Sequence, residues 1–407
     1  MEILKVHQFG PIAGLDITLK KVNVFIGEQG VGKSTLAKLL SCCRDYFLYY
    51  LILHNMDKNL IDQIFSSYGI QTYFKPDSYI EYTNAEGWCL IYCEGNFSIS
   101  NPQYGPEDSI KVIDRIVFDG IRRAYGNLMT HGKDLTTADI RKILEDNTKI
   151  IISNLRSSFY CPAERGIASV LSNSLASIFI SNIPLPQPLL EYMSFFEKAR
   201  LEYPSFSIPF LGLSYSYEDG KDIVNIDGDK VQLRYASSGI QSIVPLLMVI
   251  EYCLRKNYFS SFTIEEPELN LFPTNQLHFL QSLISKTNKD SGNLGTWTLT
   301  THSPYLLAVF NLSLLAGRIV DKFPDYSESL YSIIPQDYIL KPGDVAVYEL
   351  RRKDIGTTSC VSIIDDTTDL IKGNYLDAVS DIISADFHQL YKLYIRLSKA
   401  SVKNNVR

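Results

Sequence analysis

The 407-residue chain is 45% hydrophobic and 21% charged, a composition typical of folded globular proteins that excludes wholesale disorder. Its formal net charge of −6 argues against a whole surface that binds nucleic acid, because strong phosphate binders are usually basic. No apolar run approaches the roughly 18 residues of a membrane span, and no signal-peptide pattern is visible. We therefore expect a cytoplasmic protein without membrane contact, whose seven scattered cysteines are ordinary thiols.

A strand, a glycine-rich loop and a helix follow one another near the N-terminus. The apolar run VNVFI (22–26) predicts a strand, and KSTLAKLLSCC (33–43) has the apolar spacing of a helix. The loop fits the pattern GxxxxGK followed by Ser or Thr, whose backbone N–H groups hold phosphates while its lysine and hydroxyl reach the outer phosphates and Mg²⁺. Ser34 is the expected Mg²⁺ ligand, and the residues expected to bind a nucleotide are Gly27, Gly30, Gly32, Lys33, Ser34 and Thr35.

A mixed insertion is predicted after this loop. Alternating residues with turn signals predict an antiparallel β-meander over 78–100. Helices are expected over 107–158 and 164–203, with a break at 182–188. No heptad pattern is sustained over several repeats, so long coiled-coil arms are not expected.

A second helix start is predicted after a pair of strands over 210–235. The segment YASSGIQS (235–242) opens a long apolar helix with Ser237, Ser238 and Gly239. Hydroxyl side chains at such a position cap the helix or make its start a second anion-binding site. From the residues alone, capping is favoured.

Two adjacent carboxylates follow a short apolar strand predicted at FTI (262–264). Adjacent side chains at a strand end diverge, so Glu265 is placed to ligate Mg²⁺ and Glu266 to address an attacking water. A second strand, within GTWTLTTHSPYLL (295–307), ends in polar residues that include His302. A strand-end histidine can bond a γ-phosphate or the attacking water, or serve a structural role. The predicted catalytic residues are therefore Glu266 and His302.

In order along the chain, GEQGVGKS, YASSGIQS, FTIEEPELNLFP and TTHSPYLL resemble the motifs of soluble ABC-type ATPases of the SMC, RecF and OLD-like branch. That branch includes AAA family ATPases of bacterial anti-phage defence systems. The resemblance implies an α/β fold, in which a P-loop ABC-type ATPase head with a mixed sheet and flanking helices carries an antiparallel β lobe and a helical insertion. It assigns 1–40 and 205–345 to the ATPase core, 41–204 to the insertion, and 346–407 to strands and a helix that complete the head.

The resemblance also implies an activity and an assembly. Such ATPases hydrolyse ATP to ADP and phosphate with Mg²⁺, and two heads enclose the ATP head to tail in a dimer or a higher even oligomer. By this likeness Glu265 is the Walker B acid, Glu266 the catalytic base and His302 the switch histidine. The signature segment that reaches the partner's γ-phosphate corresponds to Ser237, Ser238 and Gly239.

The sequence departs from this pattern at several positions. Glu265 stands where most ABC proteins have Asp, and Ser238 stands where transporters have Gly. No Q-loop glutamine is visible. The segment FYCPAER (159–165) resembles a PAER segment of the soluble branch, which places Glu164 and Arg165 at the active-site edge or in an internal ion pair.

The leading functional hypothesis is an ATP-driven switch that controls a separate effector protein, because the sequence shows no second active site. A role in anti-phage defence follows from the resemblance alone. Asp365 and Asp366 are predicted to lie in a surface turn and not in the metal site of a TOPRIM nuclease domain. The alternative is a RecF-like DNA-binding repair ATPase, which the acidic net charge disfavours. The motor of a membrane transporter is disfavoured because its Q-loop is missing.

Overall fold

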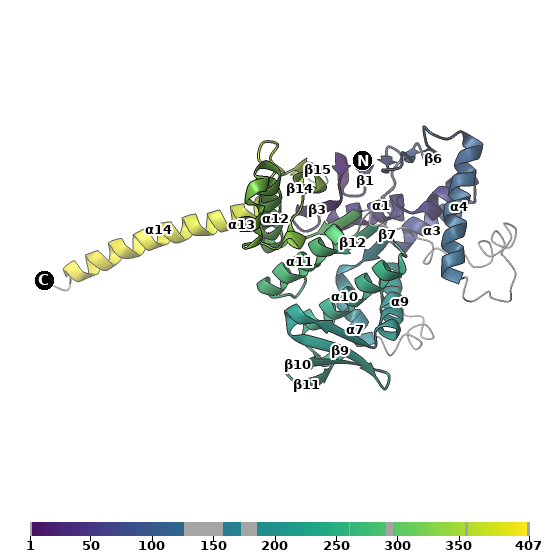
Figure 1. The fold of residues 1–407 in the computed structure, drawn as a ribbon. Coiled ribbons are helices and arrows are strands. Elements are labelled where there is room, and N and C mark those ends of the chain that lie inside the picture. Colours follow the sequence, from purple (N-terminus) through teal and green to yellow (C-terminus); the bar gives the residue numbers. More distant parts are fainter. Residues whose placement is uncertain are drawn as a thin grey trace.

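The computed structural model describes residues 2–125, 158–171, 185–259, 261–289, 296–354 and 357–404. Helices expected between residues 126 and 157 and between 172 and 184 lie outside these described ranges. An 11-stranded sheet forms the body of the molecule (Figure 1). Its strands are β1 (Glu2–Phe9), β2 (Ile12–Leu19), β3 (Val22–Gly27), β4 (Tyr79–Thr83), β5 (Cys89–Cys93), β6 (Asn96–Ser100), β7 (Ser158–Cys161), β12 (Ser261–Glu265), β13 (Thr296–Thr300), β14 (Val345–Asp354) and β15 (Thr357–Ser362).

The strand order β6-β5-β4-β1-β2-β15-β14-β3-β13-β12-β7 divides the sheet into two parts. From β14 to β7 all neighbours are parallel, and β3, β12, β13 and β7 are buried along their whole length. Continuous burial is the pattern of parallel strands that helices cover on both faces. The mixed α/β sheet with flanking helices confirms the predicted fold class.

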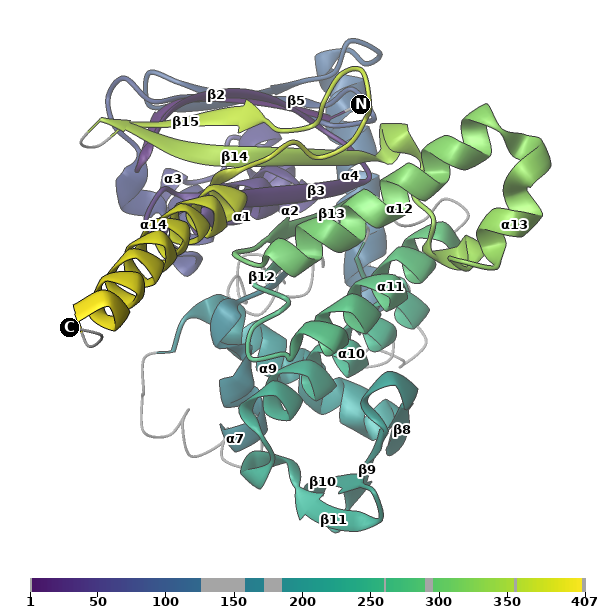
Figure 2. The same cartoon turned by 90° about the vertical axis from the view of Figure 1, so that its left-hand side faces the viewer.

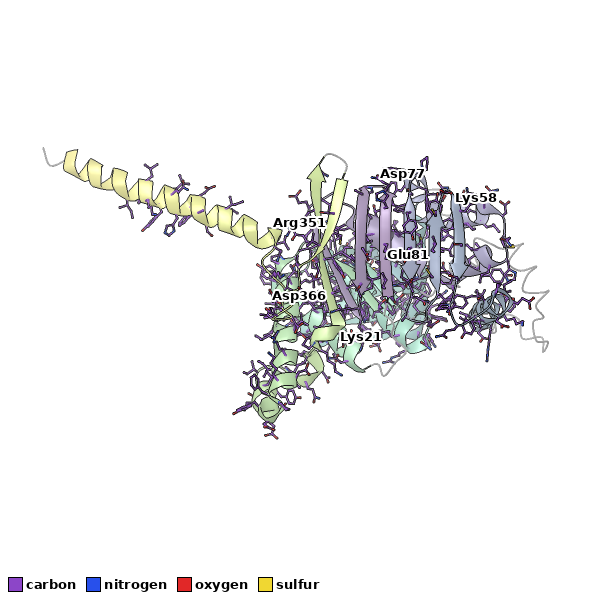
Figure 3. All side chains as sticks on the ribbon, turned by 90° about the horizontal axis from the view of Figure 1, so that it is seen from above. Lys21, Lys58, Asp77, Glu81, Arg351 and Asp366 are labelled. Atoms are coloured by element: carbon purple, nitrogen blue, oxygen red, sulfur yellow. The ribbon has the colours of Figure 1, made fainter. Side chains whose placement is uncertain are left out.

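The other part of the sheet is mostly antiparallel. β4, β5 and β6 form the expected meander, turning at Gly87 and Gly95, both of which have positive φ, and β4 pairs with β1. Partly exposed and buried residues alternate along β4, so one face of these strands is in contact with solvent. Figure 3 looks onto this part of the sheet, where Glu81 of β4 forms an ion pair of 2.8 Å with Lys5 of β1.

Helices cover both faces of the parallel part of the sheet. The helices of the described residues are α1 (Lys33–Cys43), α2 (Tyr46–Leu53), α3 (Lys58–Ser67), α4 (Pro106–Tyr125), α7 (Ile167–Leu171), α9 (Gln187–Glu202), α10 (Ser238–Lys256), α11 (Pro273–Lys289), α12 (Pro304–Lys322), α13 (Ser327–Tyr331) and α14 (Tyr375–Asn404). Strand β3 shows the division, because Val24 belongs to the core formed with α9 to α12, whereas Phe25 belongs to the core formed with α1 to α4. The phosphate-loop strand is thus clamped between two cores.

A separate four-stranded antiparallel sheet lies beside α9 and α10, in the order β11-β10-β9-β8 (Figure 2). Its strands are β8 (Ser205–Ile208), β9 (Leu213–Glu218), β10 (Lys221–Ile226) and β11 (Asp229–Gln232). The turns at Gly220 and Gly228 confirm the paired strands predicted for 210–235. Arg200 of α9 ties the sheet down through a 3.2 Å ion pair with Asp222, whose other oxygen accepts a hydrogen bond from Tyr215.

Two C-terminal helices differ in their surroundings. By length and composition α12 is the one helix of the described ranges that could cross a membrane, but Leu306, Phe310 and Leu314 are buried, as in a core helix. The predicted C-terminal helix is present as α14, and it extends away from the body in all three views (Figures 1, 2 and 3). The segment before it confirms the turn predicted at Asp365, whose carboxylate accepts the backbone N–H groups of Thr367 and Thr368.

Candidate active site

The predicted site residues meet at one edge of the parallel sheet. Register pairs Phe25 of β3 with Thr300 of β13, and Thr300 with Glu265 of β12. Because parallel strands point the same way, the loops that follow β3, β13, β12 and β7 all emerge at this edge. The edge therefore brings together the glycine loop, both carboxylates, His302 and the PAER segment, which are spread over 275 positions of sequence from Gly27 to His302.

The glycine loop has a backbone that requires glycine. Gly27 has φ +149°, and a Cβ there would lie 2.5 Å from the carbonyl oxygen of Leu350. Gly32 has φ +102° and is the N-cap of α1. Any larger residue at Gly27 would push β3 away from β14, and α1 begins from a left-handed residue that glycine adopts without strain.

Lys33 is folded back onto the loop that carries it. Its Nζ donates to the carbonyls of Gly27 and Glu28, both at 2.8 Å, and the residue is 6% exposed. Burial lowers the pKa of Lys33, and the charges of Glu266, Glu265 and Glu268 oppose that shift. A lysine ammonium at the centre of a glycine loop, next to the N-terminus of α1, is the arrangement that binds phosphate in proteins.

The two adjacent glutamates have different environments. Glu265 ends β12 and is 6% exposed, whereas the Glu266 side chain is 33% exposed. Glu266 has φ +43°, a left-handed conformation that costs a non-glycine residue roughly 1–3 kcal/mol. Its N–H donates to the Thr300 carbonyl at 2.9 Å, which holds the turn in place. The strained turn directs one carboxylate inward and leaves the next open to solvent.

Glu265 fits a metal-ligand role. Its Oε1 is buried and has no hydrogen-bond partner among the described residues. Burial, and then the charge of Glu265, raise the pKa of Tyr160, so the Tyr160 hydroxyl stays protonated near the carboxylate. Ser34 is exposed at the start of α1. Mg²⁺ in nucleotide sites takes one or two protein oxygens and the substrate's phosphates, so Ser34 and Glu265 are a sufficient protein share.

Glu268 joins the two strand-end loops. Its Oε1 accepts hydrogen bonds from the Thr301 hydroxyl at 2.6 Å and from the His302 N–H at 2.9 Å. Burial raises the pKa of Glu268, and these hydrogen bonds oppose the shift. Ser303 extends the connection by donating to Gln276 of α11 at 2.6 Å. The backbone of His302 is therefore fixed by the loop that carries the catalytic carboxylate candidate.

His302 faces Glu266 across the site. Its Nε2 lies 3.8 Å from Glu266 Oε1, and its side chain is 32% exposed. Burial, and then the positive charge of Lys33, lower the pKa of His302, so the imidazole is neutral near pH 7. A neutral imidazole can donate one hydrogen bond and accept another, as a water- or phosphate-orienting group does.

Arg165 hydrogen-bonds the backbone of both glutamates. Its guanidinium is 0% exposed, and it donates to the carbonyl of Glu265 at 2.7 Å and to that of Glu266 at 2.6 Å. A third bond runs to the Pro162 carbonyl at 3.3 Å. Of the two roles predicted for the PAER segment, Arg165 takes the one at the active-site edge, where it positions the backbone of the two carboxylates.

The signature segment lies at the start of α10. Ser237 is the N-cap residue, but its side chain makes no capping hydrogen bond, and both Ser237 and Ser238 are exposed. The favoured capping role is therefore not adopted. Gly239 packs against the loop after Glu266, because a Cβ on it would lie 2.5 Å from the Asn270 carbonyl oxygen. Both exposed hydroxyls remain available to a ligand or a second molecule.

Sequence patterns located the glycine loop, the strand-end carboxylates and His302, but not the residues that fix them. The bonding of Glu268 to Thr301 and His302 carries a weak signal, a third carboxylate just after Pro267 in EEPE. Arg352, at the end of β14, lies near the loop, with Nη2 3.6 Å from where a Cβ on Gly30 would be. Its position follows from the pairing of Leu350 with Gly27, which sequence spacing does not reveal.

A strand, glycine loop and helix beside strand-end carboxylates are the arrangement found in P-loop nucleotide-binding proteins. The family model described as AAA ATPase domain matches residues 138–307, less than half of the chain. That range contains the PAER segment, the start of α10, both glutamates and His302. The match supports an ATP-binding and ATP-hydrolysing role, and such ATPases typically use Mg²⁺. No curated protein is similar enough in sequence to serve as a relative.

Solved structures of SMC head domains are loosely similar to this chain. The SMC head domain from Thermotoga maritima is 11% identical, with a TM-score of 0.41 over 89% of this chain and 99% of that one. An Smc head domain with an extended coiled coil, bound to the C-terminal domain of ScpA derived from Pyrococcus furiosus, is 10% identical, with a TM-score of 0.39 over 95% and 99%. TM-scores below 0.5 mark a loose match, so the strand order described above defines the fold.

Proposed function

We propose that this protein is an ATP-hydrolysing molecular switch that closes head to tail with a second copy around ATP and controls a separate effector protein. The observation that carries the proposal is the meeting of Lys33, Glu265, Glu266 and His302 at one sheet edge. We place the cycle in the cytoplasm, in keeping with the free state of all seven cysteines.

Each side chain has a chemical task in this proposal. Lys33 exchanges its two loop carbonyls for the β- and γ-phosphates, and Gly27, Gly30, Gly32 and Thr35 shape the backbone around them. Ser34 and Glu265 would hold Mg²⁺, which would neutralise charge at the phosphates. Glu266 accepts a proton from the attacking water, and the neutral imidazole of His302 orients that water or the γ-phosphate.

The exposed start of α10 supports the head-to-tail arrangement. The hydroxyls of Ser237 and Ser238 and the N-terminus of a 19-residue helix face solvent and form an anion-binding terminus. Gly239 sits on the Asn270 carbonyl, so movement of α10 is transmitted to the loop that carries Glu266 and Glu268. A γ-phosphate bound at one chain's glycine loop would thereby be sensed by the other chain.

Control of a separate effector is inferred from the chemistry of the chain. Among the described residues no group of three or more His, Cys, Asp or Glu could hold a metal ion of its own. Asp365, the acidic residue that could have marked a nuclease site, is engaged in its own turn. The anti-phage setting is proposed on the likeness of the motifs to the soluble defence ATPases.

Light scattering of a Glu266→Gln variant with and without ATP and Mg²⁺ tests the switch. We expect the mass to double, or to step to a higher even oligomer, when ATP is added, because bound ATP cannot be cleaved. Adding Ser237→Arg should abolish the step, while Ser214→Arg, at an exposed serine on β9, should leave it intact. An unchanged mass while ATP still binds would refute head-to-tail closure.

A further inference from the structure

The projecting helix α14 carries a bare apolar stripe. Ile383, Phe387, Leu390 and Tyr394 are spaced by four, three and four residues, so they lie on one face. Their exposed fractions are 63%, 65%, 65% and 66%. Flanking apolar residues widen the stripe and are also exposed: Ile382, Tyr391, Leu393 and Ile395. A contiguous apolar stripe of this width differs from the single, scattered apolar residues that are normal on a protein surface.

The described residues of the rest of the chain do not cover this stripe. Side chains from 382 to 395 are all exposed, and Figure 3 shows them standing clear of the body on the extended helix. The helix is 30 residues long, or about 45 Å. Between residues 382 and 395 only Asp386 and Lys392 are charged, so this part of the helix has few groups that favour exposure to water.

We propose that α14 pairs antiparallel with α14 of a second copy and forms an interface separate from the ATP-dependent one. The heptad-like spacing sets the register, in which Phe387 is level with Leu390 of the second copy and Ile383 with its Tyr394. In the same register Tyr375 is level with Val402 of the second copy. The two helices therefore overlap from end to end, and each ends where the other begins.

The position of Asp386 and the exposed apolar area of the stripe favour an antiparallel α14 of a second copy as the partner. An antiparallel pair separates the two Asp386 carboxylates by about five residues along the axis, roughly 7 Å, whereas a parallel pair would place them level. It also keeps the two bodies at opposite ends of the helix pair. The three aromatic side chains of the stripe region alone expose on the order of 300–400 Å². With the five aliphatic ones, the stripe approaches the roughly 800 Å² per partner of a standard interface.

Sedimentation of the nucleotide-free full chain tests the pairing. We expect twice the 46.1 kDa chain mass at micromolar concentration, and chain mass for the double variant Phe387→Glu with Leu390→Glu. The matched control, Ala385→Glu with Gln389→Glu, places the same charges on the opposite face and should remain a dimer. Retained ATP binding shows that each variant is folded. A monomeric wild type, or equal masses for the two double variants, would overturn the proposal.

A charge pair tests the register. Ile383→Lys and Tyr394→Glu should each dissociate the pair at least tenfold more readily, and combining both in one chain should restore it, because the two positions face each other only between antiparallel copies. Failure of the combination to restore dimers would overturn the antiparallel register. Sedimentation of a monomeric wild type with vesicles of phosphatidylcholine and phosphatidylglycerol would instead assign the stripe to a lipid surface. The pairing needs no nucleotide, so it stands or falls separately from the proposed switch.

Discussion

The strand-end site and the helix α14 differ in what surrounds their side chains. At the site, Arg165, Glu268 and the Thr300 carbonyl hold the backbone of Glu265, Glu266 and His302 through short hydrogen bonds within one chain. On α14 a row of apolar side chains has no cover from the described residues of its own chain. The proposed nucleotide chemistry thus rests on contacts within one fold, whereas the proposed assembly rests on surfaces that these residues leave open.

The largest effect on the site is expected from weakening the hydrogen bonds of the buried Arg165. Arg165→Lys keeps the charge but cannot reach both glutamate carbonyls, so Glu266 loses its fixed position. We expect kcat to fall about 10- to 100-fold, with the Kd for ATP within about twofold. Phosphate release and equilibrium ATP binding measure the two effects.

Arg200→Lys is the matched control for this variant. Arg200 is also buried, but it bonds Asp222 in the small sheet, far along the chain from the site. We expect it to lower the free energy of unfolding and to leave kcat near the wild-type value. Equal losses of kcat in both variants would show that Arg165 acts through general stability and not by positioning the carboxylates.

Gly239 joins the closed site to the open start of α10. In Gly239→Ala the new Cβ meets the Asn270 carbonyl at 2.5 Å, so the helix and the loop must separate. We expect the free energy of unfolding to fall by about 1–3 kcal/mol in denaturant titrations. Gly105→Ala, where a Cβ meets nothing within 4 Å, should change it by less than about 0.5 kcal/mol. Similar values for both would mean that the loop yields freely.

A smaller effect is expected from protonation of His302. Its pKa lies below the ordinary value of about 6.5, so the neutral imidazole contributes stability that is complete above that value. That stability is lost as the pH falls from about 6.5 through the lower folded pKa. Relative to His302→Gln, the free energy of unfolding of the wild type should fall in this window, as measured by denaturant titrations at several pH values. A wild-type advantage that grows on acidification would contradict the assigned direction.

Much of the secondary structure could be predicted because the spacing of apolar residues and the positions of turn residues are local features of the sequence. The run 22–26, the meander at 78–100 and the apolar strand before Glu265 all appear where their patterns placed them. Strand β8 and the order of the 11-stranded sheet escaped prediction, because pairing between distant segments leaves no local trace. How far the chain divides into core, insertion and C-terminal completion stays a prediction.

The site shows the same limit. Glycines, a lysine and strand-end carboxylates predict phosphate and metal binding by their residue types. Arg165 does not, because its partners are backbone carbonyls 100 residues away, which any sequence would supply. The Ser237 side chain was expected to cap its helix and does not, since Gln241 bonds the carbonyls of Arg234 and Ala236 and shapes that turn instead.

The central claim, that the strand-end cluster hydrolyses ATP with Glu266 as the base, is tested most directly by phosphate release. We compare the wild type, Glu266→Gln and a distant control, Glu218→Gln, whose carboxylate pairs with Lys230 on the small sheet. The account predicts at least about a 100-fold loss for Glu266→Gln with ATP binding retained, and no change for the control. Wild-type hydrolysis in Glu266→Gln, or none in the wild type at saturating ATP and Mg²⁺, would contradict it.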